Sequence, residues 1–214
     1  MSSLFSYIVP CDSGAAPNPF HGMCSLAICK PGIRRAAKEG DWIAGLGSRN
    51  APVGDLSGRL IYAMRVERVL SLEEYDREAS IHWPCRIPDV KSMTLAERLG
   101  DCVYYFDDGV PKQRPGVHKS CNIKADLFGK NALLSWDYYY FGSSAPRLPD
   151  HLLPLCNKGM GCRDGMDSPH LEQFVNWVRS LAPEPGQYGW PGTVVQWQDI
   201  ATCGGCSPRV GALL

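Results

Sequence analysis

The chain has no excess of charge of either sign. Its 214 residues include 22 Lys and Arg and 22 Asp and Glu, so the formal net charge is zero. A strong overall positive field, of the kind that holds a long polyanion at physiological salt, is therefore excluded. Any contact with a nucleic acid has to come from a local basic patch.

Long hydrophobic runs are missing as well. The first apolar run, residues 4–10, is short and has no basic leader, and no run reaches the roughly 18–20 apolar residues that span a bilayer. The content of 44% apolar and 21% charged residues is that of an ordinary globular protein. We expect a cytoplasmic protein without membrane contact, and the length suits a single core.

Cysteine pairs with the spacing of metal ligands are scarce. The ten cysteines fall below the density of a disulfide scaffold, and only Cys203 and Cys206 show a two-residue spacing. A second pair, Cys156 and Cys162, is more widely spaced than one ligand knuckle. A zinc or thiol protein using Cys203 and Cys206 is one alternative, and a frayed tail is the simpler interpretation. We predict no metal site, and the sequence names no cofactor.

Short strands and short helices are expected to alternate irregularly along the chain. Strands are expected over residues 6–9, 25–29, 41–47, 60–70, 100–106 and 132–142, and helices over 31–40, 71–79, 94–100 and 168–181. The absence of a regular βαβ order predicts a single-domain α+β fold around a mainly antiparallel sheet, with a barrel-like sheet as a variant. We expect the domain over 1–182 and a Pro/Gly-rich extension over 183–214.

Four local patterns bear on these assignments. Apolar and polar residues alternate over 60–70, as in a strand with one solvent-exposed face, and Ser71 with Glu74 forms a capping box. The aromatic run 132–142 is expected to break near Asp137. The helix after Pro169 carries a regular apolar stripe that includes Phe174 and Val178.

Chemistry concentrates in residues 12–31. This segment holds an acid, an amide, an imidazole, two thiols and an amine in a Gly/Pro-rich frame. Connectors are usually only about 4–6 residues long, so a long irregular segment indicates a binding or catalytic loop. We place the site here.

Lys30 and Arg34 are the candidate phosphate anchors. They lie one turn apart at the start of the expected helix, where backbone N–H groups also favour an anion. The alternative is a solvated basic face. Cys24 and Cys29 are expected to be small core residues, although a nucleophilic cysteine beside Lys30 is a second option, because a nearby cation lowers the pKa of a thiol.

Asp12, His21 and Asp137 are the candidate acid and base groups. Asp12 followed by Ser-Gly also suits a simple Asx-turn, and His21 suits an ordinary loop position. Asp137 interrupts an apolar run, where an unpaired buried acid is costly, so pairing with Lys30 or Arg34 is expected.

The remaining candidates would contact the substrate directly. Asn18 lies in the irregular loop and is assigned to substrate binding. Trp42 and Tyr139 are the candidate stacking walls for a base, although core positions are their default.

A family resemblance rests on several short motifs and covers most of residues 5–182. The motifs are Asn18-Pro19-Phe20, Cys29-Lys30-Pro31-Gly32-Ile33-Arg34, Gly40-Asp41-Trp42-Ile43-Ala44-Gly45, Tyr62-Ala63-Met64-Arg65-Val66 and the aromatic run 133–141. Together they resemble the nucleotide modification associated domain type 2 family. The resemblance implies a part in making, reading or processing modified bases in phage or bacterial DNA.

A looser likeness is to PUA-like barrels such as the EVE and ASCH groups. It rests on Gly40-Asp41-Trp42 and on residues 62–66 alone. It implies a pocket that holds a nucleobase between apolar or aromatic walls.

The leading hypothesis is a nucleotide-binding or modified-base-binding protein that takes part in DNA base modification, either by binding the base or by catalysing a step of the modification. A non-catalytic PUA-like reader is the first alternative, and the zinc or thiol protein is the second. The expected partner is a nucleotide or nucleic acid that binds through a local basic patch.

Overall fold

The computed structural model describes residues 2–156 and 169–193. In this part of the chain the strands form two larger sheets and a hairpin. The five-stranded sheet has the order β1 (Leu4–Val9), β3 (Trp42–Gly47), β4 (Leu60–Arg65), β9 (Tyr138–Tyr140) and β10 (Gly186–Gln187). The three-stranded sheet has the order β2 (Cys24–Leu26), β8 (Asn131–Ser135) and β5 (Arg68–Ser71), and the hairpin joins β6 (Tyr104–Asp107) to β7 (Val110–Gln113).

The helices are short apart from two. They are α1 (Pro31–Ala36), α2 (Leu72–His82), α3 (Leu95–Arg98), α4 (Ile123–Phe128) and α5 (Pro169–Leu181), with 3-10 turns at Pro84–Arg86, Ser120–Asn122, Gly142–Ser144 and Asp150–Cys156. Among the described residues, none of the helices combines the length and the apolar character needed to cross a membrane.

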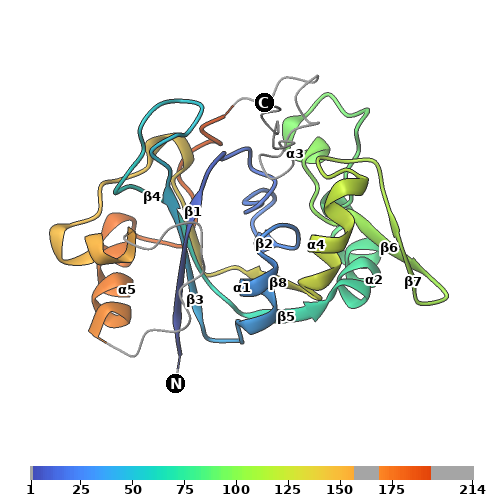
Figure 1. Cartoon of the computed structure of the whole chain (residues 1–214), viewed down its shortest axis with the longest axis horizontal. Helices are drawn as coiled ribbons and strands as arrows, with labels where there is room; N and C mark the ends of the chain where they lie inside the picture. The colour runs from blue at the N-terminus through green and yellow to red at the C-terminus, as the bar shows by residue number, and fades with distance from the viewer. Residues whose placement is uncertain (1, 157–168, 194–214) are drawn as a thin grey trace, which may run out of the picture.

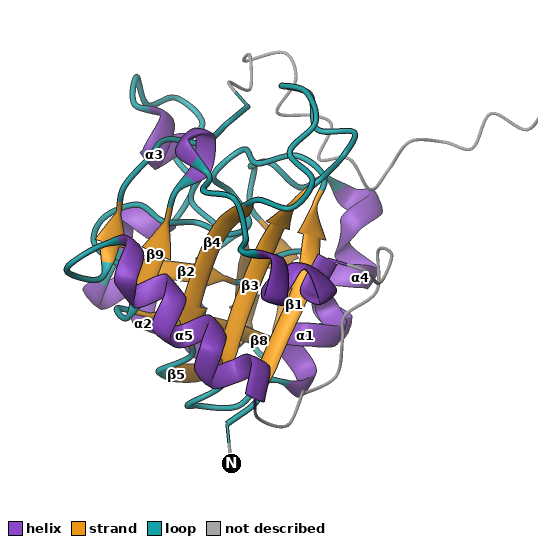
Figure 2. Cartoon of the chain, turned by 90° about the vertical axis from the view of Figure 1, so that its left-hand side faces the viewer, coloured by secondary structure: helices purple, strands orange, loops and turns teal. Residues whose placement is uncertain are grey.

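The two sheets and their helices form layers. Figure 1 shows α5 on the left of the five-stranded sheet, and the smaller sheet with α1, α2 and α4 on its right. Figure 2 shows α5 lying across the strands of the larger sheet. One buried cluster, which includes Tyr7, Leu26 and Tyr140, lies between the two sheets. The predicted α+β single domain is confirmed, and its sheets remain open instead of closing into a barrel.

Most pairings are antiparallel, as predicted. β3 with β4, β4 with β9, β2 with β8, β5 with β8 and β6 with β7 are antiparallel. The outer pairs β1 with β3 and β9 with β10 are parallel. These parallel pairs bring distant parts of the chain to the edges of the larger sheet.

The single strand predicted over residues 60–70 is wrong. The chain turns a corner at Val66 and Glu67, so that β4 and β5 belong to different sheets. The run 132–142 breaks in the same way near Asp137, as expected, into β8 and β9. At the corner the Glu67 carboxylate accepts hydrogen bonds from the backbone N–H groups of Trp136 and Asp137, the latter at 2.8 Å. A charged side chain thus satisfies the backbone where both strands leave their sheets.

The capping box and the amphipathic helix are confirmed. Ser71 Oγ accepts from the Glu74 backbone N–H at 3.1 Å, and the Glu74 carboxylate accepts from the Ser71 N–H at 2.8 Å. In α5, Phe174 and Val178 are fully buried against the larger sheet. Helix α1 is shorter than predicted, because the backbone of Ala37 is already extended.

Candidate functional site

Cys29 lies at an abrupt join between a strand and a helix. Three residues after β2, Cys29 and Lys30 both adopt left-handed backbone conformations, with φ of 59° and 39°, and Pro31 then opens α1. Such angles are costly for side chains other than glycine, and they cluster at functional sites when the surroundings enforce them. Two contacts do so here: the Cys29 N–H donates to Asp126 Oδ1 at 3.0 Å, and its carbonyl accepts from Arg34 Nε at 2.7 Å.

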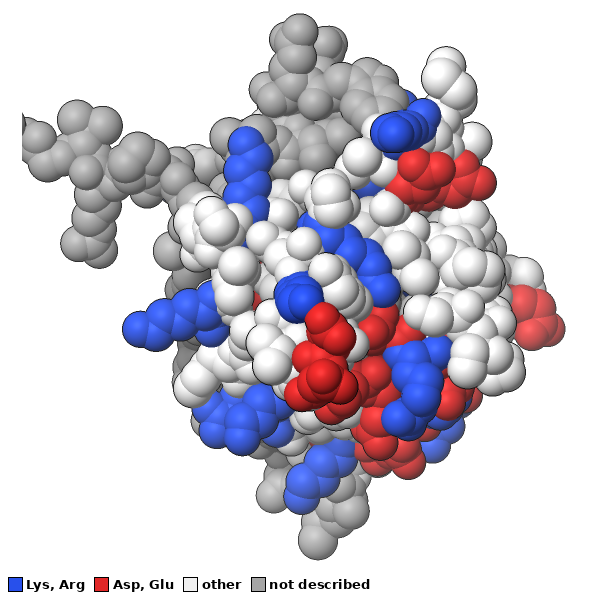
Figure 3. All heavy atoms as spheres, turned by 90° about the vertical axis from the view of Figure 1, so that its right-hand side faces the viewer, with Lys and Arg blue, Asp and Glu red and all other residues white. Residues whose placement is uncertain are grey.

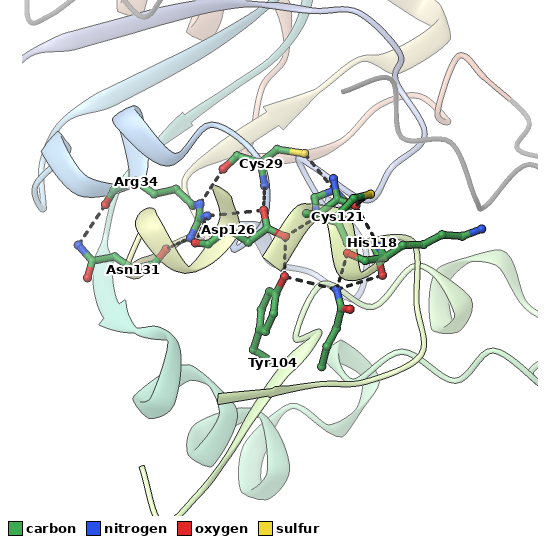
Figure 4. Close-up of polar contacts among 10 residues, drawn as sticks. Cys29, Arg34, Tyr104, His118, Cys121, Asp126 and Asn131 are labelled. Carbon is green, nitrogen blue, oxygen red and sulfur yellow. Dashed lines mark hydrogen bonds and ion pairs between the residues drawn. The ribbon is translucent and has the colours of Figure 1, made fainter. Parts of the chain in front are cut away.

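His118 faces the thiol. It comes from the loop after β7, and its Nε2 lies 3.3 Å from Cys29 Sγ. Its other ring nitrogen, Nδ1, lies 2.5 Å from Asp126 Oδ2. Figure 4 shows the three residues close together, each from a different segment. His118 and Asp126 are buried, whereas Cys29 is only partly buried, so Cys29 is the member of the group nearest to solvent.

The bond to Asp126 sets the state of the imidazole. An ionised carboxylate can only accept hydrogen bonds, so Nδ1 must carry the proton that it shares with Asp126. In the neutral ring Nε2 is then an acceptor, directed at the Cys29 thiol. His118 is therefore oriented to take the thiol proton, and Asp126 is placed to stabilise the resulting imidazolium.

Arg34 and Tyr104 hold Asp126 in place. The Arg34 guanidinium is fully buried, lies 3.9 Å from Asp126 Oδ1 and donates to the backbone carbonyls of Asp126 and Asn131, both at 2.7 Å. Burial lowers the pKa of Arg34, and the charge of Asp126 opposes that shift. A Cβ on Gly129 would lie 2.3 Å from the Arg34 guanidinium carbon, so glycine is needed there.

Tyr104 supplies the remaining donor. Its hydroxyl donates to Asp126 Oδ2 at 2.9 Å, the oxygen that also faces His118. Burial, and then the nearby charge of Asp126, raise the pKa of Tyr104. The phenol therefore remains a protonated donor across the physiological range. We call Cys29, His118 and Asp126, with Arg34 and Tyr104 behind them, the Cys29 relay.

The predicted phosphate anchors have different surroundings. Arg34 is inside the protein and its donors serve backbone carbonyls and Asp126, so the structure gives it a structural place. Lys30 is partly buried, with Nζ 3.2 Å from the carbonyl oxygen of Ile8 and 4.6 Å from the centre of the Tyr7 ring. Both roles considered from the sequence, phosphate anchor and solvated basic face, required Arg34 at the surface, but its long-range partners hold its side chain inside the protein.

Asn18 belongs to a second buried network. Its amide donates to the Leu99 carbonyl at 2.8 Å and accepts from Arg86 at 2.7 Å. Arg86 is buried and also binds the carbonyls of Phe20 and Met23 and the Ser25 hydroxyl. Ser25 and Tyr75 donate in turn to Asp101, at 2.6 and 2.7 Å. We call this set the Arg86 hub; it fastens the irregular loop to the core.

The structure does not bring Asp12 and Asp137 together. Asp12 is buried, accepting from the Tyr140 hydroxyl at 2.6 Å and from the Gly192 N–H at 3.0 Å. Burial raises the pKa of Asp12, against the effect of these hydrogen bonds. Asp137 lies 3.5 Å from Arg179 of α5, not beside Lys30 or Arg34.

The other predicted residues are also dispersed. Trp42 and Tyr139 are buried under α5, Trp42 packing edge-on against Phe174 at 6.4 Å between ring centres. A base has no access to them there. His21 is largely exposed, with its ring beside Phe20; partial loss of solvent contact, and then the charge of Arg86, lower the pKa of His21.

His118 and Asp126 are the residues of the candidate site that sequence reasoning missed. The alternative of a nucleophilic Cys29 was considered without a base to activate it. The available signal was weak: a cysteine needs a histidine and an acid that can lie far away in the sequence. His118 is 89 residues from Cys29, and five histidines offer no way to choose.

Metal ligation finds no support in the described part of the chain. There, no group of three or more His, Cys, Asp and Glu side chains is arranged to hold a metal ion. Cys203 and Cys206 lie outside the described residues.

Figure 3 shows basic and acidic side chains interspersed on the face that carries the β6–β7 hairpin.

Comparisons with known proteins give one finding. A family model described as nucleotide modification associated domain 2 matches residues 1–199. No curated protein and no solved structure matches the chain significantly.

Proposed function

The chain belongs to the nucleotide modification associated domain 2 family, and from this premise we propose that it is a cysteine-dependent enzyme acting on a nucleotide substrate. The observation that carries the proposal is the alignment of Cys29, His118 and Asp126, at 3.3 and 2.5 Å. A thiol, a base and an acid that orients the base make up a nucleophilic constellation.

Those groups support an acyl-transfer hydrolysis as the reaction. His118 Nε2 takes the thiol proton, and the Cys29 thiolate adds to an electrophilic carbonyl carbon of the substrate. The bond from that carbon to its leaving group breaks, and the leaving group takes the proton from His118. The thioester left on Cys29 is then hydrolysed by water, with His118 as the base, which restores the free thiol.

The arrangement also explains why Cys29 differs from the other cysteines. Burial raises the pKa of the Cys24 and Cys102 thiols, which keeps them protonated and inert. Cys29 is partly buried and faces an imidazole whose other nitrogen is held by a carboxylate. An adjacent imidazolium favours the thiolate.

The test is turnover together with covalent trapping. Wild-type protein would be incubated with a panel of acylated and otherwise modified nucleotides, and products and protein adducts would be followed by mass spectrometry. We expect turnover, and an adduct on Cys29 that Cys29→Ala abolishes and Cys85→Ala leaves intact; Cys85 is also partly buried but lies outside the relay. A non-catalytic reader, the alternative function, would bind nucleotides without any adduct or product.

A further inference from the structure

Two aromatic side chains near residue 190 are exposed although their backbone is fixed. Trp190 is 63% exposed and Tyr188 is 41% exposed. The Tyr188 ring stacks on Phe141, 6.0 Å away with a 26° angle between planes, and Trp190 lies 6.1 Å from Phe20 of the irregular loop. We call Tyr188 and Trp190 the aromatic shelf.

Hydrogen bonds on both sides hold the shelf. The Tyr188 N–H donates to the Tyr140 carbonyl, and the Trp190 carbonyl accepts from the Ser143 N–H, both at 2.8 Å. Asp12 fixes the following residues, its carboxylate accepting from Gly192 N–H at 3.0 Å and its carbonyl from Thr193 N–H at 2.9 Å. The buried Asp12 thus anchors the backbone that directly follows the aromatic shelf.

Close packing makes this backbone rigid. A Cβ on Gly189 would lie 1.9 Å from the Phe141 carbonyl oxygen, and one on Gly142 would lie 2.0 Å from the Trp190 carbonyl oxygen. Both positions therefore require glycine. Such tight clearances fix the backbone from which both rings project, which lowers the entropy cost of binding a ligand.

The shelf borders an open surface hollow of suitable size. The hollow has a volume of about 270 Å³, is lined by Gln187, Tyr188, Gly189 and Trp190, and opens widely to solvent. This is just below the roughly 300–1,000 Å³ of sites for drug-sized ligands, so it suits one planar ring system. Indole and phenol faces stack on nucleobases, and an amide such as that of Gln187 can bind a base edge.

We infer that the aromatic shelf is a stacking site for an unpaired nucleobase of the substrate. This inference rests on the proposed function, because it assigns the base-binding part of the nucleotide substrate. The base can belong to a free nucleotide or to a single strand, which present the same stacking face. In a duplex the base is stacked inside the helix and would have to be flipped out.

Equilibrium binding to the full chain tests the inference. The probes are the deoxynucleoside 5′-monophosphates, deoxyribose 5-phosphate as the base-free control, and a short oligonucleotide in single-stranded and duplex form, measured by calorimetry. The variants are Trp190→Ala, Trp190→Phe and Trp136→Ala; Trp136 is 41% exposed and lies away from the shelf, against Trp83. Thermal melting checks that each variant is folded.

We expect Trp190→Ala to raise Kd for base-containing probes at least about fivefold, the low end for removal of a stacked aromatic ring. Trp190→Phe should restore part of the loss, and Trp136→Ala should have no effect. Tighter binding of the mononucleotide would identify a free nucleotide as the source, and tighter binding of the single strand would identify a nucleic acid.

Equal binding by wild type and Trp190→Ala, an equal loss in Trp136→Ala, or no saturable binding by any base-containing probe up to about 1 mM would overturn the inference. Alkylation of Cys29 separates this outcome from failure of the proposed function. If the aromatic shelf binds no base but Cys29 is reactive, the enzyme proposal still stands. If Cys29 is unreactive, the enzyme proposal is wrong whatever the shelf binds.

Discussion

Arg34 and Arg86 are both buried, and the two clusters around them are built from similar parts. Each contains an aspartate that accepts from a tyrosine hydroxyl: Tyr104 donates to Asp126 at 2.9 Å and Tyr75 to Asp101 at 2.7 Å. In the Arg86 hub the next donor is the buried Ser25 hydroxyl. In the Cys29 relay it is an imidazole that continues to a partly exposed thiol.

The difference shows what separates a structural network from a candidate site. Both clusters satisfy their buried polar groups, and both join segments that are distant in sequence. Only the Cys29 relay contains a thiol that faces an imidazole, with strained backbone at the cysteine. A buried charge alone therefore indicates a role in stabilising the fold. A buried network that continues to a partly exposed reactive group indicates a candidate functional site.

The largest effect is expected when the Arg86 hub is disrupted, which should lower the stability of the whole protein. Arg86→Met leaves Asp101 buried without a compensating charge and removes donors to the irregular loop. We expect the free energy of unfolding to fall by about 3–5 kcal/mol. Urea unfolding of this variant would be compared with that of Arg114→Met, whose ion pair with Asp76 is partly exposed and should cost less.

The same variant should change the pH dependence of stability. Burial raises the pKa of Asp101 in the folded state, and the charge of Arg86 opposes that shift. The folded protein therefore binds a proton that the unfolded chain releases above about pH 4, so this group stabilises less as the pH rises. Without Arg86 the decline should extend to higher pH. An unchanged pH dependence of stability would mean that Arg86 does not influence the pKa of Asp101.

Sequence patterns predicted the structural features that depend on residues close together in the chain. The capping box at Ser71 and the apolar stripe of α5 are local, and both are confirmed. The corner at Glu67 was missed, because alternation continues through it while the strand changes sheets.

The candidate site depends on contacts that sequence periodicity does not contain. Arg34 was assigned to the surface, yet its guanidinium lies inside against Asp126, 92 residues away. Asp12 was expected to act on substrate, and it binds the backbone of Gly192, 180 residues away. The irregular loop was predicted to hold the site, and Cys29 of the candidate site lies in it, but most of its polar side chains serve the fold.

The reactivity of Cys29 should separate the two aspartates. In Asp126→Asn the amide can no longer hold the imidazole as a carboxylate does, so His118 activates the thiol poorly. An unassisted thiol with a pKa of about 8.5 is only about 0.3% ionised at pH 6, so iodoacetamide alkylation of Cys29 there should slow about 100-fold relative to a thiol that His118 keeps about one-third ionised. Asp101→Asn should leave this rate unchanged. Mass spectrometry of the Cys29 peptide gives both rates, and equal slowing would mean that the relay has no special role.

The smallest effect should distinguish the two tyrosines. Tyr104→Phe removes one hydrogen bond from Asp126, whose negative charge then acts more strongly on His118 and Cys29. That charge disfavours the thiolate and favours the imidazolium, so both transitions in the pH profile of Cys29 alkylation should move to higher pH, by up to about one unit. Tyr75→Phe removes the equivalent bond to Asp101 and should lower stability by about 1 kcal/mol without moving the profile. Because both variants lose one buried hydroxyl, a shift confined to Tyr104→Phe cannot come from lost stability alone. A profile that stays in place in both variants would show that Tyr104 only supports the fold, as Tyr75 does.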